Sequence, residues 1–238
     1  MRSMKRQCIG VLAVTLFAGP ALAADLAVKA PVYKAPPPVF FSWTGLYIGG
    51  HAGGAWNTSD WFFPDFGTAT SHSASSALGG GQIGYNYQVS SWVFGVQGDV
   101  SGLSLIGQSV CPNPGDNCRT EQKWIASATA RLGYAWDAAL LYAKGGAAWS
   151  HDDYSVINAA TGVTTEINSG GGDRAGWTLG GGLEYAFWHK WSAFVEYDHF
   201  DFGTEKFSTV SPNTGAFVEH LNVGQRVDEV KAGVNYRF

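Results

Sequence analysis

The chain has 238 residues, with 15 basic and 19 acidic side chains, and only 14% of its residues are charged. This balance argues against a nucleic-acid partner, which would require clustered positive charge. Glycine and aromatic residues are abundant, with 32 Gly, 10 Trp, 10 Tyr and 14 Phe. Beyond the N-terminal region, no apolar run approaches the roughly 20 residues of a transmembrane helix. A membrane protein with this sequence would therefore have to span as a closed barrel.

Residues 1–23 have the pattern of a secretory signal peptide. Three basic residues open the chain, residues 8–18 are almost wholly apolar, and Ala-Leu-Ala at 21–23 supplies a small-residue cleavage site. The apolar run is too short for an uncleaved membrane anchor, so we predict cleavage after Ala23. Cleavage leaves 12 basic and 19 acidic residues, a net charge of −7.

Residues 24–42 are rich in proline and show no periodicity. Such a composition predicts an extended linker, here on the periplasmic side. From residue 43 to residue 238 the pattern changes to repeated alternation of apolar and polar residues. We therefore predict three regions: a signal peptide at 1–23, a linker at 24–42 and a barrel at 43–238.

Eight segments of the barrel region alternate with a period of two residues. The last, 229–238, sets Val230, Val234 and Phe238 on one face and Glu229 on the other. Segments of this length are sufficient for tilted membrane strands, which need about 9–11 residues. The sequence predicts an all-β fold, an eight-stranded antiparallel up-and-down transmembrane β-barrel. The predicted strands lie at 43–56, 82–89, 92–100, 124–134, 140–149, 177–187, 191–197 and 229–238.

Short and long connections alternate between these segments. The short joins lie near residues 90–91, 137–138 and 188–190, and the long joins cover about 57–76, 104–122, 150–174 and 203–224. Short periplasmic turns and long external loops are typical of outer-membrane barrels. Within the third long join, residues 154–167 surround Thr161-Gly162 with apolar residues, which predicts a hairpin above the membrane.

Aromatic residues gather at the two ends of the predicted strands and indicate two interfacial girdles. On the side of the short turns they are Trp92, Tyr134, Trp136, Tyr185, Phe187, Trp188, Trp191, Tyr236 and Phe238. On the side of the long loops they are Trp56, Trp124, Trp149 and Trp177.

Two cysteines remain after the predicted cleavage, Cys111 and Cys118. They flank a turn-forming stretch at 112–117. In an oxidising periplasm this arrangement favours a small loop disulfide. A metal pair is the weaker interpretation, because no histidine or further cysteine lies beside them.

The inward faces of the predicted strands collect seven charged residues, which form a predicted interior charge network. They are Asp99, Arg131, Lys144, Glu184, Glu196, Glu229 and Lys231. An eight-stranded barrel is only wide enough for its own side chains, so these charges should pair with one another. The network serves either as a structural plug or as a gate that rearranges to pass ions, and the sequence does not separate the two.

The chain resembles a group of small outer-membrane proteins of alphaproteobacteria. The resemblance is carried by Trp-Thr-Gly-Leu-Tyr-Ile-Gly-Gly at 43–50, by residues 84–87 and 141–146, and by the final Val-Asn-Tyr-Arg-Phe. The group is described as porin-family or outer-membrane immunogenic proteins and is related to the OmpA-type barrel. The resemblance implies the bacterial outer membrane as the location. It also implies that Tyr236 and Phe238 belong to a signal read by the barrel-assembly machinery.

We expect an integral outer-membrane barrel with a structural role in the envelope and a role as a surface antigen, without enzymatic activity and without a cofactor. The expected partners are membrane lipid, lipopolysaccharide and the barrel-assembly machinery. Two alternatives stay open. One is a narrow pore for ions or small solutes. The other is a surface receptor for a host ligand or for haem, which His72, His151 and His220 would bind from three predicted loops.

Overall fold

The computed structural model describes residues 41–111, 115–168 and 172–238. The predicted signal peptide at 1–23 lies outside the described residues, as does all but the end of the predicted linker at 24–42. In the described ranges, no helix is long and apolar enough to cross a membrane.

Nine β-strands make up the described part of the chain. Their bounds are β1 Gly45–Phe63, β2 Thr68–Val89, β3 Trp92–Val110, β4 Asp116–Trp136, β5 Ala139–Asn158, β6 Thr164–Asn168, β7 Asp173–Trp188, β8 Trp191–Val210 and β9 Phe217–Arg237.

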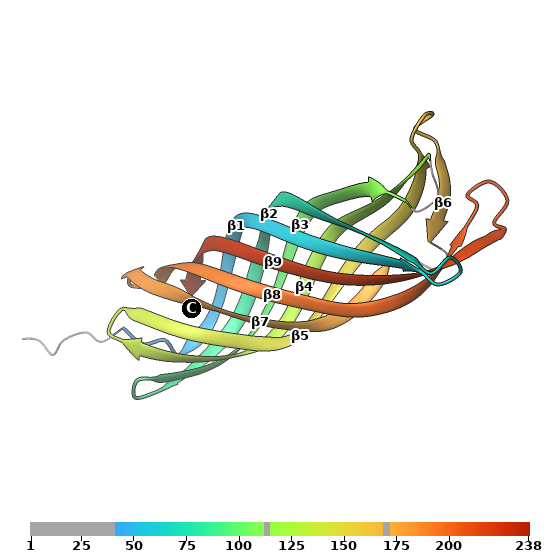
Figure 1. Ribbon diagram of the computed structural model, residues 1–238. Coiled ribbons are helices and arrows are strands. Elements are labelled where there is room, and N and C mark those ends of the chain that lie inside the picture. Colours follow the sequence, from blue (N-terminus) through green and yellow to red (C-terminus); the bar gives the residue numbers. More distant parts are fainter. Residues whose placement is uncertain (1–40, 112–114, 169–171) are drawn as a thin grey trace, which may run out of the picture. The chain divides into compact units, whose positions relative to one another are not determined.

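Eight of these strands close into an antiparallel barrel (Figure 1). Each of β1, β2, β3, β4, β5, β7, β8 and β9 pairs with its neighbour along the chain, and β1 pairs with β9 to complete the circle. The prediction of an eight-stranded up-and-down barrel is therefore confirmed. The ninth strand, β6, is short and extends the end of β5 as a hairpin, in the region where the sequence predicts one.

Side chains alternate between the barrel interior and its outer surface, as the two-residue period requires. On β4, Thr129 and Arg131 are buried inside, whereas Ala130 and Leu132 are exposed. The same alternation runs along the other barrel strands. Within the barrel the arrangement is the reverse of a water-soluble protein, because the apolar residues face out and the polar residues face in.

The connections at one end of the barrel are two-residue turns. Ser90 and Asp137 begin two of them, and both have a positive φ, at 56° and 55°. The third short turn, at residues 189–190, joins β7 to β8. These turns lie where the sequence predicts the short joins.

The opposite end differs from the prediction, because the long joins are mostly strand. β1 continues to Phe63 and β2 begins at Thr68, so that their connection is only residues 64–67. The ladder between them is continuous up to this turn. The abundant Ser, Thr, Asn and Gly of these segments is typical of loops. Nevertheless, the backbone keeps its inter-strand hydrogen bonds, and the strands rise well beyond the predicted membrane segments.

Glycines on the strands make room for large interior side chains. A Cβ atom on Gly84 would lie 2.4 Å from the Tyr47 ring. One on Gly233 would lie 2.7 Å from the Phe194 ring. These missing side chains leave the space that the Tyr47 and Phe194 rings occupy inside the barrel.

Candidate functional site

Two rings of aromatic side chains mark where the barrel meets the membrane interfaces. On the turn side, Trp92 and Tyr134 pack edge to face with ring centroids 5.5 Å apart. On the loop side, the outward-facing tryptophans are Trp56, Trp124, Trp149 and Trp177. Tyr134 follows Trp124 by ten residues on one strand. With a rise of about 3.3 Å per residue and a tilt of about 40°, this length spans roughly 25 Å, the height of the apolar band of a membrane barrel.

The two lysines of the predicted charge network meet at the centre of the interior. Lys144 Nζ lies 2.8 Å from Glu196 Oε1 and 3.1 Å from Asp198 Oδ2. Lys231 Nζ lies 2.8 Å from Asp198 Oδ2 and 3.3 Å from Asp99 Oδ1. All five side chains are almost fully buried. The lysines and carboxylates therefore pair with one another inside the barrel, away from solvent, with three acids for two lysines.

A second group of charges lies nearer the short turns. Arg131 Nη2 donates to Glu184 Oε2 at 2.5 Å, and the Arg131 guanidinium stacks on Tyr142 at 3.4 Å from the ring centroid. Glu184 also lies 3.7 Å from Arg237 Nη2. Arg237 in turn stacks on Trp43, with 4.7 Å from its Cζ to the ring centroid. This lower group carries two arginines for one glutamate.

Glu229 is the least well paired member of the network. Its Oε2 is 3.7 Å from Lys231 Nζ, and among the described residues neither of its carboxylate oxygens has a hydrogen-bond partner. The structure thus brings all seven predicted charges into one interior network. It adds Asp198 and Arg237, which were not among the predicted charges. Both stand two residues from a neighbour on the inward face, so that strand alternation alone points to them.

Apolar side chains close the interior on both sides of the charges. Toward the short turns lies the turn-side plug, formed by Trp43, Val93, Ala135, Leu140, Tyr142 and Ala186. Above the charges lies the middle apolar layer, formed by Ala55, Leu78, Leu105, Ile125, Ala148, Phe200, Phe202 and Val227. A third cluster, the loop-side layer, contains Trp61, Phe63, Cys111, Cys118, Tyr154, Val156, Leu221 and Val223. A solvated ion crossing the barrel would have to displace each of these layers.

A buried polar cluster separates the two upper layers. Arg174 Nη1 donates to Tyr154 Oη at 3.0 Å and to Gln225 Oε1 at 3.1 Å. Gln225 Nε2 donates to Asp152 Oδ1 at 3.1 Å. Burial raises the pKa of Asp152 to about 6, although hydrogen bonds from Ser150 and Gln225 oppose the shift. This cluster lies beyond the loop-side girdle and ties β5, β7 and β9 together.

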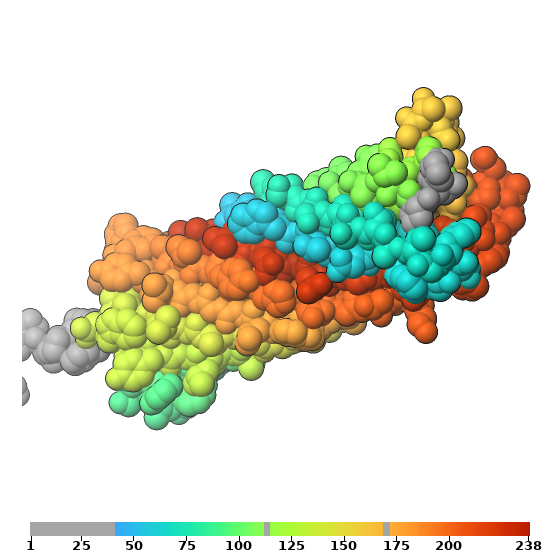
Figure 2. All heavy atoms as spheres, in the orientation of Figure 1, coloured from blue at the N-terminus to red at the C-terminus, as the bar shows by residue number. Residues whose placement is uncertain are grey.

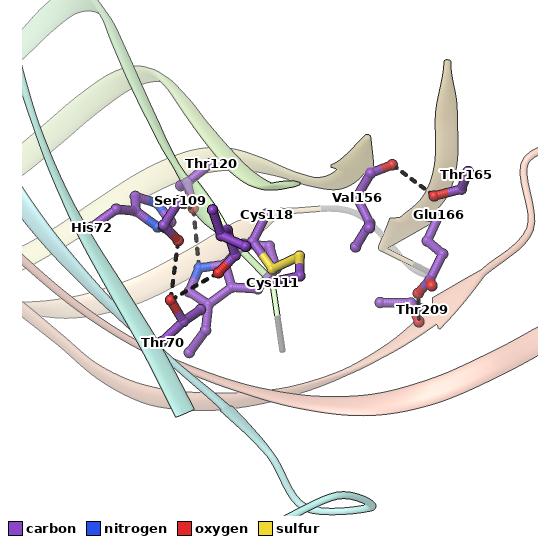
Figure 3. Close-up of a disulfide and its surroundings, with 12 residues drawn as sticks. Thr70, His72, Ser109, Cys111, Cys118, Thr120, Val156, Thr165, Glu166 and Thr209 are labelled. Carbon is purple, nitrogen blue, oxygen red and sulfur yellow. Dashed lines mark hydrogen bonds between the residues drawn. A yellow bond between two sulfur atoms is a disulfide. The ribbon is translucent and has the colours of Figure 1, made fainter. Parts of the chain in front are cut away.

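Cys111 and Cys118 form a disulfide, with their Cα atoms 5.2 Å apart (Figure 3). The bond joins the end of β3 to the start of β4. Both sulfur-bearing side chains are buried in the loop-side layer. The sequence predicts this disulfide in a loop, whereas the structure places it at the tip of a long strand pair.

His72 lies inside the barrel on β2 and not in a loop. Its Nδ1 is 3.3 Å from Ser109 Oγ, and its Nε2 is 3.0 Å from Thr120 Oγ1 (Figure 3). Burial lowers the pKa of His72, so the neutral ring bridges hydroxyl groups on two neighbouring strands. Thr70 adds a further link across the same gap, with its Oγ1 3.3 Å from Ser109 Oγ.

The other two histidines of the haem hypothesis have separate partners. His151 Nδ1 lies 2.7 Å from Asp173 Oδ1, and His220 Nδ1 lies 3.3 Å from Asp65 Oδ2. In residues 41–111, 115–168 and 172–238, no three His, Cys, Asp or Glu side chains are arranged to hold a metal ion. The structure does not bring the three histidines together.

Carboxylates from three separate segments approach one another at the loop end. They are Asp65, Glu166 and Glu219. Thr209 Oγ1 donates to Glu166 Oε2 at 2.7 Å (Figure 3). Burial raises the pKa of Glu219 to about 7, and the charges of Glu166 and Asp65 act in the same direction. This carboxylate therefore titrates near neutral pH.

Tyr236 and Phe238 lie on the outward, membrane-facing side at the C-terminal end of β9. Phe238 is exposed, and its ring packs edge to face on Tyr236 with centroids 5.2 Å apart. The Phe238 amide donates to the Leu46 carbonyl at 3.0 Å, which continues the closure between the last and first strands. Both predicted assembly residues are therefore presented at the turn-side girdle.

An apolar outer band between aromatic rings, together with a filled interior that holds a buried charge network, defines an integral membrane β-barrel. The comparisons with known proteins identify its kind. The chain belongs to the family described as outer membrane protein beta-barrel domain, whose model matches residues 9–238. Its location is the bacterial outer membrane, and its outer surface contacts membrane lipid.

Two relatives are similar over nearly the whole chain. The 31 kDa outer-membrane immunogenic protein of Brucella melitensis is 33% identical, over 94% of this chain and 95% of that protein. The 25 kDa outer-membrane immunogenic protein of Brucella abortus is 27% identical over the full length of both.

Solved structures of two outer-membrane proteins share the fold. The outer-membrane protease OmpT of Escherichia coli has a TM-score of 0.52 at 10% identity, covering 83% of this chain and 98% of its own. OprG of Pseudomonas aeruginosa has a TM-score of 0.51 at 15% identity, covering 82% of this chain and 96% of its own. At these identities the likeness shows the fold alone.

Proposed function

We propose that the protein is a non-conducting structural barrel of the outer membrane that also acts as a surface antigen. The observation that carries this proposal is the filling of the interior. A charged network lies between the turn-side plug and the middle apolar layer. Buried apolar layers exclude water, and permeation needs a continuous hydrated path.

The antigenic role is supported by the strands beyond the loop-side girdle and by the relatives. In the proposed orientation the two-residue turns face the periplasm and the extended strand pairs face the cell exterior. Hairpins such as 57–76 then present a rigid, hydrogen-bonded surface. Relatives of similar length are named outer-membrane immunogenic proteins.

We also propose that the protein has no enzymatic activity. The best nucleophile and base pair is Ser101 and His51, with 3.0 Å between Oγ and Nε2. Both side chains are buried inside the barrel. Within the described ranges, His51 Nδ1 has no hydrogen-bond partner, so no acid orients the ring as a catalytic triad requires.

Assembly is proposed to depend on the C-terminal strand. Tyr236 and Phe238 present aromatic rings on the outward face, where a component of the barrel-assembly machinery could read them before the barrel inserts. Lipopolysaccharide is the proposed lipid partner on the exterior side.

The sealed-barrel proposal is tested by single-channel conductance in a planar bilayer. The refolded protein is first shown to migrate differently on gels when boiled and unboiled, which establishes that the barrel has formed. We expect no discrete openings from the folded protein. Openings that change in Lys144→Ala or Arg131→Ala would overturn the proposal and make the charge network a gate.

A further inference from the structure

A groove of about 690 Å³ lies on the outward surface of the barrel beyond the loop-side girdle. It runs across β2, β1, β9 and β8, which are neighbours in the sheet, and Figure 2 shows the face along which β1, β9 and β8 run. Asp60 faces outward four residues beyond Trp56 on the same strand. At the strand rise and tilt given above, this places the groove roughly 10 Å above the girdle.

A missing side chain creates the hollow. Gly224 pairs with Asp60 on one side and with Thr204 on the other, so the outward row of side chains is interrupted between them. Beside it, β8 is irregular between Asp201 and Thr204. At this irregularity Gly203 adopts a φ of 62°, a conformation that favours glycine. The groove is therefore built into the backbone and does not depend on a side-chain rotamer.

The rim of the hollow carries donors and acceptors of several kinds. Arg226 Nη2 lies 3.1 Å from Asp60 Oδ2, and both side chains are more than half exposed, so a ligand can compete for them at small cost. Asp201 accepts a hydrogen bond from the Gly203 amide. In the part of the chain that the structure describes, no hydrogen bond of the Asn222 or Thr204 side chain is found. One arginine against two aspartates gives the rim a formal charge of −1.

An aromatic ring stands beside these polar groups. Phe62 faces outward next to Asn222, its cross-strand partner, and the Phe62 side chain is exposed. Phe62 lies six residues beyond Trp56 on the same strand, outside the loop-side girdle. An exposed apolar ring flanked by a few oriented polar groups is the usual composition of a small-molecule site.

We propose that this groove binds a neutral, hydroxyl-rich sugar ring in the headgroup of the outer-leaflet glycolipid. Sugar hydroxyls both donate and accept, which suits a rim with two carboxylates, an amide, a hydroxyl and a guanidinium. The C–H face of a sugar packs on an aromatic ring such as Phe62. A phosphate is a poorer match, because two aspartates face it for one arginine.

The membrane position selects the source of the sugar. The groove stands at the height of a headgroup whose acyl chains pack against the apolar band below Trp56. A lipid anchored there holds its sugar beside the groove at a high effective concentration. The inference rests on the proposed function for two points, namely that the strand extensions face the cell exterior and that lipopolysaccharide is the lipid partner there.

The test uses the full mature barrel in phospholipid nanodiscs that contain purified rough-type lipopolysaccharide. Gly224→Trp fills the hollow, where an added Cβ would meet only Thr204 Oγ1 at 3.3 Å and Asp60 at 3.8 Å. Asn222→Ala removes one rim group without adding bulk. Gln108→Trp adds the same large ring on an exposed position of β3 outside the groove. Glycolipid retained per barrel after detergent washing is measured for each, once a gel shift shows that the variant has folded.

We expect the unchanged barrel and Gln108→Trp to retain at least tenfold more glycolipid than Gly224→Trp, and Asn222→Ala to lie between them. Dephosphorylated glycolipid should be retained equally well. Equal retention by all variants would overturn the inference, as would loss of retention on dephosphorylation. Binding of the free core oligosaccharide as tightly as the membrane glycolipid would also overturn it. None of these results depends on conductance, so the sealed-barrel proposal stands or falls separately.

Discussion

Replacing Lys231 by methionine tests how completely water is excluded from the interior charge network. Lys231 Nζ lies within 3.7 Å of four carboxylates, those of Asp99, Glu196, Asp198 and Glu229. Methionine keeps a long flexible chain in the same space but removes the charge. The four acids then share a single nearby lysine, Lys144.

The expected loss in the free energy of unfolding is about 3–5 kcal/mol, the range for removing one partner of a buried ion pair. The upper end is expected, because Lys231 serves four acids and is itself fully buried. Lys206→Met is the matched control, since Lys206 is exposed on β8. A surface change of this kind should stay within about 0.5 kcal/mol.

The measurement is urea unfolding of the refolded barrel in lipid vesicles, followed by tryptophan fluorescence. Lys231→Met combined with Glu229→Gln should lose less than the sum of the two single variants, because the second change removes a charge that the first leaves unpaired. A loss below about 1 kcal/mol for Lys231→Met would refute the reasoning. Such a small loss would mean that water already screens these charges. The proposal of a sealed interior would then fail as well.

Three further outcomes are expected at the loop end and the C-terminus. The raised pKa of Glu219, about 7, means that the folded state favours its protonated form. Its contribution to stability is complete below the unfolded pKa of about 4.5 and is lost as pH rises through 7. Proteolytic nicking at the loop end should therefore increase from pH 5 to pH 8, and Glu219→Gln should remove that increase. Reduction of the Cys111–Cys118 bond, whose short loop predicts about 2.5 kcal/mol, should expose the β3–β4 tip to protease without abolishing the gel shift of the barrel. Deleting Phe238 should lower the amount of barrel assembled in cells severalfold while leaving refolding into detergent unchanged, and equal assembly would argue against an assembly signal.

Much of the fold could be predicted because the membrane imposes one rule on every strand. Residues such as Leu132 and Phe94 must face lipid, so period-two alternation is strong between the girdles and gives strand number and phase. Inward charges such as Arg131 and Lys144 are predicted equally well, because a charge at the inward phase of a membrane strand faces the barrel interior and not the lipid. The disulfide follows from two cysteines that flank a turn.

The same rule fails beyond the loop-side girdle, and Asp198, one of the two missed charges, lies close to that boundary. The predicted strand 191–197 ends one residue before Asp198, the acid with the shortest contact to Lys231. His199 faces outward there and hydrogen-bonds with Asp228, with 2.7 Å between Nδ1 and Oδ1. Polar residues such as His199 and Asp228 at outward positions are typical of loops. Nevertheless, the pairing of β8 with β9 continues through both residues.

His72 illustrates a second limit. It lies between Ser71 and Ser73, so its neighbours give no apolar phase from which to place it. Its inward position follows from β2 pairing with β1, in which Ser59 faces His72, and from Trp61, whose ring centroid lies 5.9 Å from that of His72. These contacts join His72 to residues of another strand, so no local sequence pattern predicts them.

The strand prediction fails beyond the loop-side girdle for one physical reason, which also shows where the membrane ends. Between the girdles the apolar side chains face outward, as at Trp177 and Leu179. From the level of the loop-side girdle the phase inverts: Phe200 and Phe202 are buried inside, while Thr204 is exposed. Lipid requires an apolar outer surface, whereas water requires a polar one and an apolar core. The strands therefore carry two hydropathy patterns of opposite phase on one continuous hydrogen-bonded ladder. The middle apolar layer stands where the inversion occurs, and the interior closes at the height where the barrel leaves the membrane.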